Sequence, residues 1–249
     1  MSHTQNTKKF PAIKLFTLGV AFGMRNVSPF CLKIEMLLTS LDIPFTEGVE
    51  QDPRKAPKGK LPFLEVDGVR IADSELITQY LDEITNGSVF AGISAKDKAY
   101  GLALTRLAED HLYWLMVASR WLDDAWFPNV VSGFFGIAPA FIRPLIANGA
   151  RKQVRKTFEL HGLGKHTLAE QQNFARRDLQ AIQDAVGERD FLFGDAPNIY
   201  DFTVASILTG YIDNKPVTWL TDLGLEFPAL KDYAERVQTH VGVFAREAS

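Results

Sequence analysis

Cysteine is almost absent from this sequence, which contains Cys31 and no other thiol. An intramolecular disulfide and a cysteine-based zinc cluster are therefore excluded, and a reducing, cytoplasmic location is the expected one. An excess of basic charge is also missing, because 27 Lys and Arg face 30 Asp and Glu, and the net charge of −3 is unlike that of nucleic-acid-binding surfaces. We therefore predict no nucleic-acid partner. The histidines show no HExxH pattern and no clustering at ligand spacing, so no metal site is predicted.

Long uninterrupted apolar runs are missing too. Residues 1–9 are polar and lack the apolar core of a secretory signal. Residues 127–149 are apolar and approach the roughly 20 residues that a spanning helix needs. They contain Pro128, Pro139 and Pro144, however, and repeated prolines break the backbone pairing that lipid demands. We predict short helices over a core or a pocket here, and membrane insertion is not expected.

Residues 11–88 show the pattern of a mixed sheet covered by helices. Ser28-Pro29 is a typical helix start, because serine caps the helix and proline fits its first position. Asp67-Gly68 predicts a tight hairpin turn between two short apolar runs. The expected order is a strand at 13–18, a glycine-punctuated loop at 19–27, a helix from Ser28, an extended run from Ile43, hairpin strands at 61–66 and 69–71, and a helix from Asp73-Ser74.

Residues 95–249 predict helices alone. A long, unusually aromatic helix is expected over 96–121. Thr167 and Asn198 each precede a capping-box partner, Glu170 and Asp201 respectively, and each pair predicts the start of a helix. A final helix is expected to begin at Pro228. The segment from Gly92 to Ala95 is expected to link the first domain to this separate helical domain.

Three segments are candidates for binding chemistry. The Ser28 hydroxyl at a helix N-terminus would stabilise a bound thiolate, although a simple capping role explains it equally well. A cis Leu61-Pro62 bond would leave the Leu61 backbone free to pair with an extended peptide ligand, whereas a trans proline would merely begin a strand. Asp73-Ser74 offers a carboxylate site at a helix start, and an ordinary cap is again the alternative.

The order of these segments resembles the glutathione transferases. The stretches SPFCLKIEMLLTSLDIPF and APKGKLPFLEVDGVRIADSELITQYL are similar to their N-terminal domain, and FLFGDAPNIYDFTVA is similar to the capping-box motif of their helical domain. Within that superfamily, RLAEDHLYWLMVASRW and HGLGKHTLAEQQNFARRDLQAI resemble the metaxin and failed-axon-connections branch and its bacterial relatives. The resemblance implies an α/β thioredoxin-like N-terminal domain and an all-α C-terminal domain.

The resemblance also implies roles for individual residues. Ser28 stands where many family members keep the serine or cysteine that contacts the glutathione sulfur. Leu61, before a cis-Pro62, would pair through its backbone with the cysteinyl unit. Asp73 and Ser74 stand where the family holds the γ-glutamyl end, usually with Glu-Ser. Asn198 and Asp201 match a folding motif and not a catalytic one.

Other residues leave two interpretations open. Lys60 either reaches the glycyl carboxylate or is solvated, and we favour solvation. Cys31 occupies the second position of a C-x-x-C-like spacing, but its position one turn into the helix favours a small apolar role over thiol–disulfide exchange. Tyr113, Trp114, Arg120 and Trp121 either line a pocket for a second, apolar substrate or belong to the core.

The resulting expectation is an enzyme that uses glutathione as a co-substrate and conjugates its thiolate to an apolar electrophile, in the cytoplasm and as a homodimer. Two departures from the family favour a different class of function, a non-catalytic interaction module. The loop at 19–27 is longer than in most glutathione transferases and would re-aim or cover the Ser28 site. The branch also includes proteins known for interaction or import roles.

Overall fold

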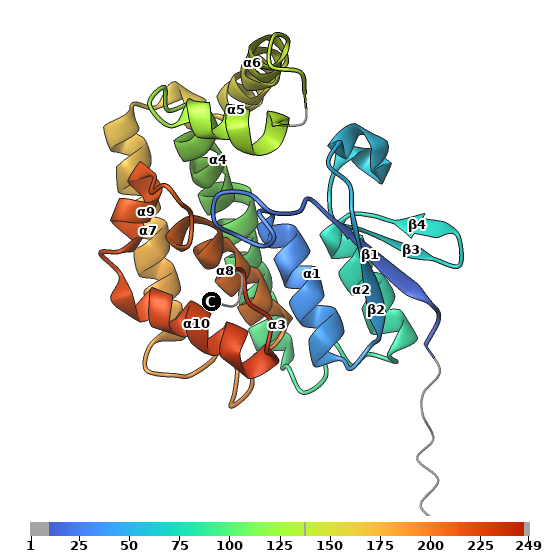
Figure 1. Cartoon of the computed structure of the whole chain (residues 1–249). Helices are drawn as coiled ribbons and strands as arrows, with labels where there is room; N and C mark the ends of the chain where they lie inside the picture. Colours follow the sequence, from blue (N-terminus) through green and yellow to red (C-terminus); the bar gives the residue numbers. More distant parts are fainter. Residues whose placement is uncertain (1–9, 137, 247–249) are drawn as a thin grey trace, which may run out of the picture.

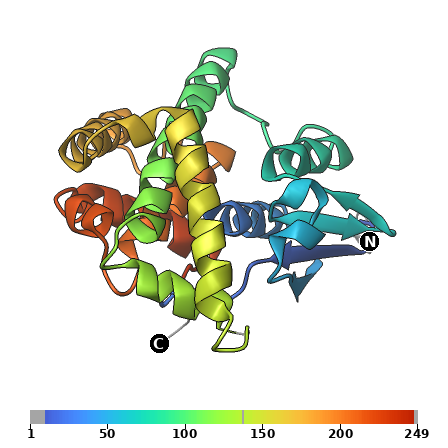
Figure 2. The ribbon, with the colours of Figure 1, turned by 90° about the horizontal axis from the view of Figure 1, so that it is seen from above.

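The structure, a computed structural model, describes residues 10–136 and 138–246. The polar stretch 1–9, for which the sequence predicts no secretory signal, lies outside the described residues. A sheet with two covering helices forms one half of the molecule, and helices form the other (Figure 1). The two halves lie side by side when the molecule is seen from above (Figure 2). The predicted fold class is confirmed, and the exact division at 88–95 stays a prediction.

The sheet has four strands in the order β2-β1-β3-β4. β1 pairs parallel with β2 and antiparallel with β3. Ile13 and Leu15 of β1 are buried on the face that packs with α1 and α2, and Phe16 points to the other face, where it stacks on Phe63 of β3. The strands are β1 (Ile13–Thr17), β2 (Phe45–Val49), β3 (Phe63–Val66) and β4 (Val69–Ile71), and the covering helices are α1 (Pro29–Ser40) and α2 (Ser74–Ile84).

The helical half is arranged around α8, which is buried along nearly its whole length. Because α8 also packs against α1, it joins the two halves of the molecule. The helices of this half are α3 (Ala95–Arg106), α4 (Tyr113–Trp121), α5 (Phe127–Phe135), α6 (Arg143–His161), α7 (Leu168–Val186), α8 (Ile199–Ile212), α9 (Trp219–Gly224) and α10 (Pro228–Val241), with a π-helical turn η3 (Leu107–Leu112) between α3 and α4.

The predicted helix starts are confirmed. Ser28 caps α1 by accepting a hydrogen bond from the Cys31 amide, with Pro29 in the first turn. Thr167 and Asn198 both form complete capping boxes. The long helix expected over 96–121 is confirmed as continuous helix over 95–121, with the π-turn η3 inside it. A π-turn of this kind often accompanies a functional site.

The apolar segment 127–149 is divided between two helices, with residue 137 outside the described part. Of these, α5 is short, as predicted, whereas α6 is a long helix. The segment contributes α5 and the first third of α6, a helix that continues to His161. In the part of the chain that the structure describes, no helix is long and apolar enough to cross a membrane.

The loop at 19–27 is fixed against the helical half. Phe22 inserts between the rings of Trp126 and Phe134, with ring centroids 4.9 and 5.0 Å away. The Arg25 amide donates to the Ala245 carbonyl at 2.8 Å, so the loop is also tied to the C-terminal segment. These contacts hold the loop beside α5 and leave Ser28 in the wall of a cleft.

Candidate functional site

A cleft of about 410 Å³ lies between the two halves of the molecule. It brings together residues from the start of α1, the segment before β3 and the start of α2. The residues expected to bind glutathione that line it are Ser28, Lys60, Leu61, Asp73 and Ser74. Pro62 follows Leu61 in a cis peptide bond and is buried next to the cleft. Segments separated in the sequence therefore converge as the resemblance implied, while their individual roles stay predictions.

Ser28 lies at the N-terminus of α1 and is 6% exposed. Its Oγ accepts a long hydrogen bond of 3.4 Å from the Cys31 amide, and its own amide donates to the Asn26 side chain at 3.3 Å. A hydroxyl has one proton to donate and two lone pairs, so it can accept the cap bond and still act as a donor, and this hydroxyl also lies within hydrogen-bond reach of the Cys31 thiol. Ser28 can therefore cap α1 and contact a sulfur at the same time.

Cys31 has no access to the cleft. Its side chain is fully buried, and this burial raises the pKa of the thiol to about 12. A thiol with such a pKa is protonated at neutral pH and is a poor nucleophile. The small apolar role is therefore the one that fits, and thiol–disulfide exchange at Cys31 does not.

The start of α2 forms a second polar corner of the cleft. Asp73 is the N-cap and accepts a hydrogen bond from the Glu75 amide at 3.2 Å. Ser74 is the first residue of the helix and is 5% exposed. The first amides of a helix have no carbonyl partner within it, and they lie at the positive end of the helix dipole. A ligand carboxylate is favoured at this point.

Two carboxylates in the cleft wall, those of Glu75 and Glu109, form ion pairs with basic side chains. One terminal nitrogen of Arg106 on α3 donates to both carboxylate oxygens of Glu75, at 2.9 Å each. Lys33 of α1 holds Glu109 of η3 at 2.6 Å, and both of these side chains are buried. The sequence analysis missed both pairs, because 31 and 76 residues separate the partners and no local motif links them.

Aromatic side chains form the wall opposite the sheet. Tyr113 and Trp114, at the start of α4, line the cleft, and Tyr113 packs edge-on against Phe30 at 4.8 Å. Arg120 and Trp121 do not line it: Arg120 is buried, and Trp121 stacks on Phe134 of α5. The predicted apolar pocket is therefore limited to the first turn of α4.

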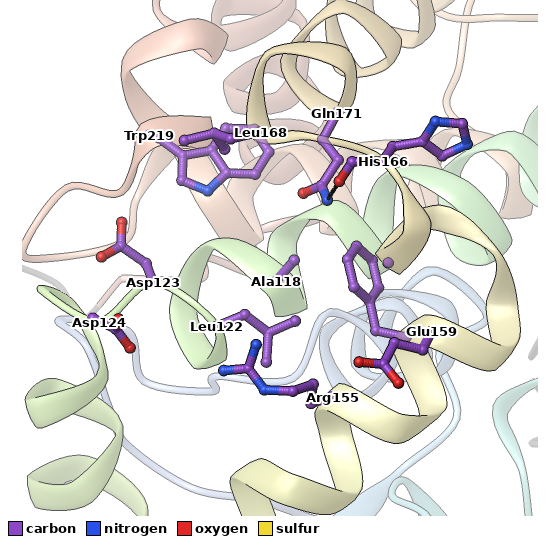
Figure 3. Close-up of a pocket in the computed structure, with 12 residues that line it drawn as sticks. Ala118, Leu122, Asp123, Asp124, Arg155, Glu159, His166, Leu168, Gln171 and Trp219 are labelled. Carbon is purple, nitrogen blue, oxygen red and sulfur yellow. Dashed lines mark hydrogen bonds between the residues drawn. The ribbon is translucent and has the colours of Figure 1, made fainter.

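A second cavity of about 440 Å³ lies among α4, α6, α7 and α9 (Figure 3). Leu122, Leu168 and Trp219 provide its apolar walls, and Arg155 points into it from α6. The residues expected to bind glutathione do not line this cavity. Within the described residues, no group of three or more histidine, cysteine, aspartate or glutamate side chains is arranged to hold a metal ion.

Comparison with known proteins gives relatives of one kind. The family model of the glutathione S-transferase N-terminal domain matches residues 29–126. The isoprene-epoxide–glutathione S-transferase of Rhodococcus sp. (strain AD45) is 30% identical over 88% of this chain and 94% of its own length. Failed axon connections of Drosophila melanogaster is 28% identical and metaxin-1 of Macaca fascicularis 24%, over 83% and 79% of this chain and 51% and 64% of theirs.

Solved structures agree on the fold. A glutathione S-transferase from Methylobacterium radiotolerans, in complex with glutathione sulfonate, has a TM-score of 0.62 at 18% identity and covers 96% of both chains. The beta-etherase LigF from Sphingobium sp. has a TM-score of 0.60 at 17% identity, covering 91% of this chain and 95% of its own. The fold is therefore shared well beyond recognisable sequence similarity. Together with the near-complete match to the Rhodococcus enzyme, it shows that this chain belongs to the glutathione S-transferase family.

Proposed function

We propose that this protein is a glutathione transferase that binds glutathione in the cleft and joins its sulfur to a small apolar electrophile. Ser28 donates a hydrogen bond from its hydroxyl to the thiolate, and the start of α2 holds the γ-glutamyl carboxylate. The thiolate attacks an electrophilic carbon, so a carbon–sulfur bond forms while the bond from that carbon to its leaving group breaks. Stabilisation of the sulfur anion is the main catalytic effect.

The convergence of Ser28, Leu61 and Ser74 in one cleft is the observation that carries this proposal. Glutathione is a tripeptide with a thiol in its middle unit and a carboxylate at each end, and these three residues offer it a hydroxyl, an extended backbone segment and a helix start. Tyr113 and Trp114 add an aromatic wall beside the Ser28 corner, which suits an apolar second substrate. The Rhodococcus relative is named for isoprene epoxide, a small electrophile, and this supports a small second substrate here. A cytoplasmic location and a homodimer remain part of the expectation.

The alternative, a non-catalytic interaction module, is favoured by the similarity to metaxin-1 and failed axon connections. A module of that class needs no open glutathione site. In this chain the long loop packs beside α5 and leaves Ser28 in the cleft wall, which supports the enzyme.

Calorimetric titration of glutathione into wild-type protein and Ser74→Ala tests the proposal. Ser74→Ala removes one hydrogen bond to a charged carboxylate, which is worth about 1.5–3 kcal/mol. Glutathione affinity should therefore fall by roughly tenfold or more. Ser88→Ala, which removes a hydroxyl from the turn after α2, is the matched control and should leave affinity unchanged. Absence of binding to the wild type would refute the proposed function, and an unchanged affinity in Ser74→Ala would refute the carboxylate site.

A further inference from the structure

A buried cation lies behind the cleft. Arg120 of α4 is 5% exposed, and its guanidinium lies over the Phe22 ring, 5.4 Å from the ring centroid. One terminal nitrogen donates to the Gly210 carbonyl, while its Nε has no hydrogen-bond partner. Within residues 10–136 and 138–246, no carboxylate forms an ion pair with it. Arg120 is thus a buried charge without a counter-charge.

Such an arrangement is costly and calls for an explanation. Removing a cation from water costs several kcal/mol unless an anion and hydrogen bonds compensate for it. Buried unsatisfied donors are correspondingly rare, and an ordered water, a bound ion or a functional role can each account for one. Burial lowers the pKa of Arg120 to about 10, so the group is still charged at neutral pH. A negatively charged ligand is one source of the counter-charge that the protein itself does not provide.

The surroundings of Arg120 place it beneath the Ser28 corner. The Gly210 carbonyl that it binds belongs to α8 where that helix approaches α1: a Cβ added at Gly210 would lie 3.7 Å from the Cβ of Pro29. Tyr113, seven residues before Arg120, lies on the same face of α4 and lines the cleft beside Ser28. The two residues are also close enough for the guanidinium charge to lower the pKa of the Tyr113 phenol, against the stronger effect of burial.

The other ionisable groups near this corner do not supply an anion. The buried carboxylate of Asp213, at the end of α8 and three residues after Gly210, is paired with Arg246. Tyr113 on α4 and Cys31 on α1 are both neutral at physiological pH, because burial raises the pKa of each. On η3 and on α2, Glu109 and Glu75 are neutralised by their own cations. The remaining carboxylates of the cleft wall, those of Asp73 and Asp110, lie at the start of α2 and on η3, and Lys60 lies at the exposed edge.

We propose that the missing counter-charge is the thiolate of bound glutathione, and that Arg120 lowers the pKa of that thiol through its field from behind the Ser28 corner. The inference rests on the proposed function. Arg120 forms no bond and transfers no proton: the thiol proton passes to solvent, and the guanidinium keeps its charge throughout. Ser28 touches the sulfur, whereas Arg120 supports the anion from the interior, where low polarity makes one charge effective.

The test compares Arg120→Met, which keeps volume and loses charge, with Arg120→Lys, which keeps charge. Thiolate absorbance of bound glutathione is followed against pH, and turnover with an activated aryl halide is measured at pH 6.5 and pH 9. An opposite charge nearby shifts a pKa by about one to three units. Arg120→Met should therefore raise the thiol pKa by about one unit or more and slow turnover at pH 6.5 roughly tenfold. The difference in turnover between Arg120→Met and the wild type should be smaller at pH 9. Arg120→Lys should restore most of the wild-type thiol pKa and turnover.

Two controls and a second neutral variant distinguish the possible causes of a negative result. S-methylglutathione cannot ionise, so its affinity, measured by calorimetry, should be the same for wild type and Arg120→Met. Arg151→Met, which removes a partly buried arginine paired with Asp124 away from the cleft, should leave the thiol pKa unchanged. Arg120→Gln, which can still donate to the Gly210 carbonyl, serves as the neutral variant if Arg120→Met does not fold.

The outcomes are distinct. A neutral variant that binds S-methylglutathione normally and titrates bound glutathione as the wild type does would overturn the role of Arg120 and leave the proposed function intact. A wild type that binds neither ligand would overturn the proposed function itself.

Discussion

Replacing Asp201 with alanine should weaken the fold strongly and leave the cleft untouched. The Asp201 carboxylate is completely buried beneath the turn before α8. It accepts hydrogen bonds from the Leu192 amide at 2.8 Å, the Asn198 amide at 2.9 Å and the Tyr233 hydroxyl at 2.8 Å. It therefore fastens the start of α8 to the preceding turn and to α10.

The magnitude follows from what the substitution leaves behind. The Leu192 amide and the Tyr233 hydroxyl would both be buried without an acceptor, and each such donor costs about 1–3 kcal/mol. Loss of the capping-box bond to Asn198 adds about 1 kcal/mol. Burial raises the pKa of Asp201, so part of this loss is offset by no longer desolvating a carboxylate. We expect the free energy of unfolding to fall by roughly 3–5 kcal/mol.

Urea unfolding at 15 °C measures this difference, and S-methylglutathione titration of the folded protein measures the cleft. Asp201→Asn keeps the shape but turns an amide donor toward a backbone donor, so a loss of about 1–2 kcal/mol is expected. Asp195→Ala, an exposed aspartate in the same turn, is the control and should stay within about 0.5 kcal/mol of the wild type. An Asp201→Ala protein of normal stability, or one that folds and no longer binds, would refute the reasoning.

Three further predictions concern buried or paired side chains. Cys31 should resist a thiol reagent at pH 8 in the native protein and react in urea, because burial raises its pKa to about 12; rapid native labelling would contradict this. Lys33→Met should lower the free energy of unfolding by about 3 kcal/mol by leaving Glu109 buried without its cation, and Lys33→Met/Glu109→Leu should recover most of it; an equally unstable double variant would count against the pair. The hydrogen bond to Asp178 raises the pKa of His111, so its stabilisation is complete below the ordinary histidine pKa of about 6.5 and fades as pH rises through the folded value. Asp178→Asn should therefore cost up to about 1 kcal/mol at pH 5.5 and less at pH 9, where an equal loss at both pH values would refute the linkage.

Local chemistry explains why so much of the fold could be predicted. A cap such as Ser28 or Asn198 acts within three residues of itself, so the printed sequence carries the whole signal. The hairpin at Asp67-Gly68 is similar, since both residues adopt the positive φ that such a turn requires. The residues of the cleft could be predicted only because the resemblance to the glutathione transferases indicated which of these local features lie together.

Features that depend on distant partners could not be predicted. In the sequence, Arg120 cannot be distinguished from other polar residues of an aromatic helix. Its burial depends on the packing of α8 and of the loop at 19–27 against it. The π-turn over Leu107–Leu112 has no sequence signature, yet it ends directly before Tyr113, which lines the cleft. The loop was expected to re-aim or cover Ser28, and its anchoring to the C-terminal segment is a contact across 220 residues.

The central claim is that Ser28 activates glutathione bound in this cleft, and one comparison tests it most directly. Wild type and Ser28→Ala are assayed for turnover with an activated aryl halide at saturating glutathione. Loss of one hydrogen-bond donor to a developing anion lowers turnover by about 10²-fold at the lower end, and we expect this decrease in Ser28→Ala. Its affinity for S-methylglutathione should stay within about twofold of the wild-type value. A variant that keeps its rate and loses only about 1 kcal/mol of stability would show that Ser28 is a helix cap alone. A wild type that neither binds glutathione nor turns over the electrophile would contradict the account and favour the interaction module.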